Sequence, residues 1–140
     1  MEYGDDLAYV FVHYPIGSHR FPRSAAHAAE CAAREGAFAA YAGELFSRQD
    51  SLGLKTWSSI AVEAGVADTV GFNQCVSNGE AFDRVEKGRD VGSLIGVTGT
   101  PTVIVNRWRL PTPPYSGFSD VIEGLLAGRA PFVSEENDVR

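Results

Sequence analysis

A long stretch of helix-forming sequence, enclosed by two segments of β-forming sequence, constrains the fold of this chain most strongly. Residues 7–14, LAYVFVHY, are β-branched, aromatic and apolar, and Pro15 follows them. Residues 102–105, TVIV, form the second such segment. Runs of this kind predict strands. The near-continuous apolar character of the first run predicts a strand that is buried on both faces of a sheet.

The sequence between these segments predicts helices over about residues 22–95. An alanine-rich run at 24–34 and apolar residues at helical spacing in 37–48 predict the first two, with Pro22 in a first turn. Three more are predicted around 57–65, 68–78 and 80–95, with Asp68 as a capping residue. A short edge strand at 108–110 and a last helix at 118–127 follow. This order predicts an α/β fold with one small sheet.

Charge and hydropathy exclude several classes of partner and segment. The net charge is −6 and the isoelectric point is about 5.0, which argues against nucleic acid because phosphate binding needs a basic face. No window reaches the roughly 18 consecutive apolar residues of a membrane span. The acidic start of the chain does not match a signal peptide, which begins with basic residues and an apolar run.

Three strings in this layout resemble the DsbA-like branch of the thioredoxin superfamily, a group of thiol–disulfide oxidoreductases. They are VFVHYPI at 10–16, AAHAAECAAREGAFAAYAGELF at 25–46 and FNQCVSNGEAFDRVEKGRDVGSLIGVTGTPTVIVN at 72–106. The resemblance covers about residues 5–126. It implies an α/β, thioredoxin-like fold with an inserted helical block, in one domain over residues 1–133. Residues 134–140 are expected to form a flexible tail.

The Gly-Thr-Pro step is the local motif most typical of this family. In the family the corresponding proline is cis, and the preceding residue turns its backbone toward an extended substrate. The resemblance therefore implies a cis bond between Thr100 and Pro101. It also implies that both residues bind an extended peptide or protein that contains cysteine. From the residues alone, a trans proline at the start of a strand is the ordinary alternative.

The departure from the family concerns its catalytic motif. Family members carry Cys-x-x-Cys near a helix N-terminus, where the thiolate is favoured, and no such motif occurs in this sequence. The missing unit also contains a central strand of the sheet. We therefore expect an N-terminally truncated chain with an incomplete small sheet, which a partner or the missing N-terminal segment completes. We predict no catalytic residue and no cofactor.

Cys31 and Cys75 are the two cysteines of the chain. The resemblance makes them a candidate for a structural disulfide within the helical block. Two buried free thiols, or one reactive thiol, are the alternatives. His27 stands four residues before Cys31 and so shares its helix face. His13, His19 and His27 match no zinc-binding spacing, so no metal site is predicted.

Taken together, the sequence predicts a DsbA-like protein that is inactive in dithiol chemistry. Whether such a chain is an enzyme stays open at this stage. One alternative is a non-catalytic peptide-binding module of thioredoxin fold. Another is a glutathione-binding relative of the kappa-transferase and isomerase type. Family members mostly work outside the cytoplasm, but this chain shows no export signal, so the sequence assigns no compartment.

Overall fold

The computed structural model describes residues 3–17, 21–111 and 117–131. Within these residues the chain forms six α-helices, two short strands and two 3-10 turns, grouped into two compact units. The helices are α1 (Pro22–Arg34), α2 (Phe38–Ser47), α3 (Trp57–Glu63), α4 (Thr69–Asn78), α5 (Phe82–Leu94) and α6 (Phe118–Leu126). The strands are β1 (Ile104–Val105) and β2 (Trp108–Arg109), and the 3-10 turns are η1 (Gly4–Asp6) and η2 (Gln49–Ser51).

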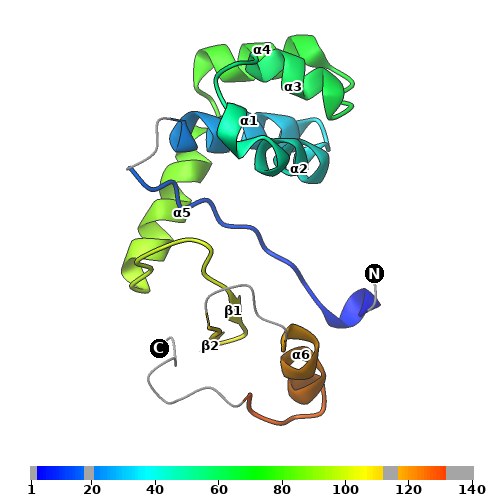
Figure 1. Cartoon of the computed structure of the whole chain (residues 1–140), viewed down its shortest axis with the longest axis vertical. Coiled ribbons are helices and arrows are strands. Elements are labelled where there is room, and N and C mark those ends of the chain that lie inside the picture. Colours follow the sequence, from blue (N-terminus) through cyan, green and yellow to red (C-terminus); the bar gives the residue numbers. More distant parts are fainter. Residues whose placement is uncertain (1–2, 18–20, 112–116, 132–140) are drawn as a thin grey trace. The chain divides into compact units, whose positions relative to one another are not determined.

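The helical unit comprises Val12–Val91 and is built around α1. Helix α1 packs against α2, α3 and α4, which Figure 1 shows grouped together. The alanine-rich composition of α1 is one reason for this packing, since small alanine side chains allow neighbouring helices to approach closely. Aromatic and aliphatic side chains from the other helices fill the space around α1. The fully buried ones include Tyr41, Phe72 and Ile60.

Local sequence signals set the ends of these helices as expected. Pro22 occupies the first turn of α1, where its missing N–H costs nothing. Asp68 caps α4, because its Oδ1 accepts hydrogen bonds from the backbone N–H groups of Val70 and Gly71, at 3.1 and 2.9 Å. Gly79 ends α4 in the left-handed region, with φ of 68°.

His13 contacts side chains of both α1 and α2 within the helical unit. The His13 Nε2–H donates to the Glu30 carboxylate of α1 at 2.9 Å, and Arg84 of α5 pairs with the same carboxylate at 3.0 Å. The His13 ring packs edge-on against Phe38 of α2, with 5.9 Å between ring centroids. Burial lowers the pKa of His13, and the Glu30 charge opposes that effect. The neutral imidazole is therefore held as a hydrogen-bond donor beside α1.

The second unit comprises Met1–Phe11 and Gly92–Arg140, of which the described residues hold β1, β2 and α6. The two strands pair antiparallel, with Ile104 opposite Arg109 and Val105 opposite Trp108. The Arg109 guanidinium donates to the carbonyl oxygens of Ile95 and Gly96, at 2.5 and 3.2 Å. The strand pair is thereby joined to the segment that follows α5. The predicted strand at 102–105 is shortened to its last two residues.

The predicted strand over residues 7–14 is wrong. These residues form an extended trace (Figure 1), and the sheet of the described chain contains β1 and β2 alone. Leu7, Tyr9, Val10 and Val12 are 40%, 80%, 76% and 49% exposed, so the run is not buried on both faces. β propensity reflects the fit of a side chain against cross-strand neighbours. The pattern therefore identified a segment suited to a sheet, but it could not supply the partner strand.

An α/β arrangement with an incomplete small sheet, as predicted, is nevertheless what the structure has. Helices at 22–34, 38–47, 57–63, 69–78 and 82–94 separate the extended segment from β1. The predicted tail at residues 134–140 lies outside the described residues, and the single domain over 1–133 stays a prediction.

Candidate functional site

A disulfide between Cys31 and Cys75 is the chemically distinctive feature of the helical unit. Cys31 lies on α1 and Cys75 on α4, with a Cα–Cα distance of 5.7 Å and an S–S distance of 2.07 Å. That Cα separation is well within the limit of about 7 Å for a bridge. Cys31 is fully buried and Cys75 is 4% exposed. The bond therefore joins two helices inside the core, out of reach of a large thiol substrate.

His27 lies beside this disulfide, one turn before Cys31 on α1. Its Nε2 is 3.7 Å from the Cys31 sulfur, and the residue is 3% exposed. The imidazole stacks on the Phe82 ring, with 3.9 Å between centroids and 11° between planes. Burial, and then the positive charges of Arg34 and Arg23, lower the pKa of His27. The side chain is therefore a neutral imidazole at pH 7, fixed in orientation.

The other predicted site residues lie in the second unit. The Thr100–Pro101 peptide bond is cis, as the resemblance implies. Both residues are exposed, and the Thr102 hydroxyl closes the loop by donating to the Gly99 carbonyl at 2.7 Å. The structure does not bring this loop together with the cysteines in one compact unit. Thr100 and Pro101 thus remain candidates for binding a peptide.

The three histidines considered as metal ligands have different surroundings. His13 is hydrogen-bonded to Glu30, and His19 lies outside the described residues. His27, however, forms a buried cluster with both cysteines, in which the possible ligand atoms lie within 4.8 Å of one another. The sequence predicted no metal site and did not indicate that these three residues lie together. The spacing of His27 and Cys31 was a usable signal, but no local pattern places Cys75 beside them.

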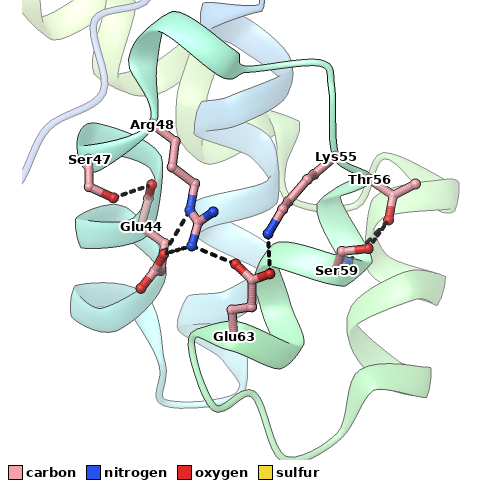
Figure 2. A network of polar contacts seen from close by, with 7 residues as sticks. All are labelled: Glu44, Ser47, Arg48, Lys55, Thr56, Ser59 and Glu63. Atoms are coloured by element: carbon pink, nitrogen blue, oxygen red, sulfur yellow. Dashed lines mark hydrogen bonds and ion pairs between the residues drawn. The ribbon is translucent and has the colours of Figure 1, made fainter.

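A network of charged side chains links α2 to α3 on the surface of the helical unit. Arg48 Nη2 lies 2.7 Å from the carboxylate of Glu44 in α2 and 2.6 Å from the carboxylate of Glu63 in α3, and Lys55 also binds Glu63. Figure 2 shows Arg48 between the two glutamates. The hydrogen bond from Lys55 lowers the pKa of Glu63, and the hydrogen bond to Glu44 raises the pKa of Arg48. These charges satisfy one another, so the network is best explained as a structural contact.

The arrangement of an inserted helical block, a cis-proline loop and a small sheet defines the thioredoxin-like class. A family model described as Thioredoxin matches residues 1–123. This chain therefore belongs to the thioredoxin family, whose general character is that of a thiol–disulfide oxidoreductase module.

Curated relatives extend the comparison. The chain is 36% identical over 131 residues to a protein of Mycolicibacterium vanbaalenii named Na(+)/H(+) antiporter NhaA 1, and 36% identical to its namesake in Mycolicibacterium gilvum. These alignments cover 91% of this chain and 21% of each relative. A Herminiimonas arsenicoxydans protein named Na(+)/H(+) antiporter NhaA is 36% identical over 110 residues, covering 77% of this chain and 17% of that protein.

The chain thus spans about a fifth of the length of the curated relatives it matches. No solved structure matches it with significance. None of the helices in the described part of the chain has the length and apolar character needed to cross a membrane.

Proposed function

We propose that this chain is a DsbA-like thioredoxin module that binds extended, cysteine-containing peptides and performs no dithiol chemistry by itself. The observation that carries the proposal is the placement of its two cysteines. Both are joined in a buried disulfide between α1 and α4, and the sequence offers no Cys-x-x-Cys motif in their place. The reactive pair that the family's chemistry requires is therefore lacking from this chain.

The chemistry of thiol exchange explains why the buried pair is a poor substitute. Exchange begins when an accessible thiolate attacks a disulfide sulfur in line, and a second thiol then resolves the mixed disulfide. In the folded chain neither sulfur of Cys31 or Cys75 is open to the approach of a protein substrate, because the residues are 0% and 4% exposed. Cys31 also lies in the last turn of α1, away from a helix N-terminus that would favour its thiolate.

Peptide binding is proposed for the loop that contains Thr100 and Pro101. Family resemblance supports this assignment, and both residues are exposed. An extended peptide can bind to such a loop through backbone hydrogen bonds, as a strand does at a sheet edge. The exposed side chains of Leu7, Tyr9, Val10 and Val12 support a related proposal, in which a strand from a partner completes the small sheet.

An insulin-reduction assay tests the proposal. With dithiothreitol as reductant, we expect the chain to leave the rate at its uncatalysed value, because no accessible thiol can attack insulin. Binding of a cysteine-containing peptide, followed by NMR shifts of Thr100 and its neighbours, is expected in the same preparation.

A Cys31→Ser, Cys75→Ser double variant is the control for this assay. Turnover that survives in a Cys31→Ser, Cys75→Ser double variant would place the chemistry elsewhere in the chain. Turnover that the double variant abolishes would make the buried pair the redox centre. Either result contradicts the proposal, as does a peptide that leaves the Thr100 resonances unmoved.

The curated relatives favour a second candidate function, a module that works together with a sodium–proton antiporter. The observation is the 36% identity over 91% of this chain to proteins that carry that name. A chimera tests it: the matched segment of the Mycolicibacterium vanbaalenii protein is replaced by this chain, and Na⁺-driven proton movement is measured in membrane vesicles. We expect exchange equal to that of the parent and above that of a deletion variant. A chimera that behaves like the deletion, or a deletion as active as the parent, would refute the idea.

A further inference from the structure

The side chains of His27, Cys31 and Cys75 form a cluster of possible metal ligands. We propose that reduction of the disulfide converts these three side chains into a zinc site in the core of the helical unit. Their possible ligand atoms already lie within 4.8 Å of one another, and all three residues are buried. Two thiolates and one imidazole are ligands that zinc prefers in proteins.

The spacing of the ligand atoms suits a tetrahedral ion. Zinc–sulfur bonds of about 2.3 Å and zinc–nitrogen bonds of about 2.0–2.1 Å place sulfur and nitrogen ligands roughly 3.6 Å apart. The His27 Nε2 lies 3.7 Å from the Cys31 sulfur, so the distance between these two atoms already fits. The 5.7 Å between the Cα atoms leaves room for the Cys75 sulfur to take up a second ligand position once the bond has opened.

The residues around the cluster favour the binding of zinc. His27 is held by its stack on Phe82, with its Nε2 atom 3.7 Å from the Cys31 sulfur, and a fixed orientation is what a metal ligand requires. A neutral imidazole is the form that binds metal. Zinc with two thiolates carries no net charge, and burial penalises charge strongly. Three protein ligands leave one position of the ion for water or a small molecule.

An external dithiol serves as the reductant of the disulfide. The dithiol gives two electrons to the Cys31–Cys75 bond, becomes a disulfide itself and leaves two thiols on the protein. One zinc ion then displaces the two thiol protons, which pass to solvent, and binds the His27 lone pair. The consequence is structural, because α1 and α4 stay linked in both redox states, by a covalent bond in one and by a metal in the other.

Zinc and cobalt binding to the full chain test this inference. The protein is reduced with a phosphine under argon, freed of reductant and titrated with Zn²⁺, or with Co²⁺ as a spectroscopic probe. We expect one metal per reduced chain, a thiolate-to-cobalt charge-transfer band, and protection of both thiols from alkylation. The oxidised protein should bind neither ion at this site.

Variants separate the site from other metal-binding groups. His27→Ala should weaken zinc binding by at least about tenfold, since even outer contacts of a metal ligand are worth 10–100-fold. His13→Gln, a change at another buried histidine, should leave the affinity unchanged. If the reduced chain unfolds without metal, Zn²⁺ should restore its helical circular dichroism in wild type and not in His27→Ala. A folded reduced chain that binds no zinc, or equal binding by wild type and His27→Ala, would overturn the proposal.

Discussion

Reduction of the Cys31–Cys75 bond is expected to lower the free energy of unfolding by about 4 kcal/mol. The bridge closes a loop of 44 residues, and opening it frees the unfolded chain to adopt conformations that the bridge forbids. Total stabilities are commonly only about 5–15 kcal/mol. The expected loss is therefore a large part of the total free energy of unfolding. Urea unfolding followed by circular dichroism, with and without dithiothreitol, measures it.

The control for this experiment is a Cys31→Ala, Cys75→Ala double variant. Its stability should resemble that of reduced wild type, and dithiothreitol should not change it. A chelator belongs in every sample, because zinc bound by the reduced cluster would hide part of the loss. A reduced wild type that unfolds at the same urea concentration as the oxidised protein would show that the bridge contributes nothing to stability.

The helices were the most predictable part of this fold. Their signals are local: Pro22 begins α1, Asp68 caps α4 and Gly79 ends it, and each needs only its sequence neighbours. The failed strand at residues 7–14 had an equally clear composition. A strand, however, forms only when another strand pairs with it. The whole fold, rather than the sequence of the segment, determines whether that partner strand is present.

The candidate site shows the same division between local and distant information. Family resemblance indicated the cis bond at Pro101 and the cysteine pair, because both belong to recurring family positions. It gave no reason to place His27 against that pair or Phe82 against His27. Those contacts arise from the packing of α1, α4 and the start of α5. A single sequence does not reveal that packing, and so it could not predict that His27, Cys31 and Cys75 lie together.

Gly88→Ala is expected to destabilise the protein by about 2 kcal/mol, although alanine is the better helix former. A Cβ atom at Gly88 would lie 2.4 Å from the His13 carbonyl oxygen, and 3.2 and 3.3 Å from the nitrogen and carbonyl carbon of that residue. These are backbone atoms and cannot swing aside. Relief of the overlap requires residue 13 to move away from α5, which weakens its buried hydrogen bond to Glu30.

Two further variants make this prediction specific. Gly43→Ala, on an exposed face of α2 with no atom within 4 Å of the new Cβ, should instead raise stability by about 0.5–1 kcal/mol. Glu30→Gln should cost less in the Gly88→Ala background than in wild type, because the first change has already disturbed the bond that the second removes. Urea unfolding of the four variants measures both effects. Gly88→Ala and Gly43→Ala could instead raise the free energy of unfolding equally, or the losses from Glu30→Gln and Gly88→Ala could be strictly additive. Either result would show that α5 does not hold residue 13 against α1.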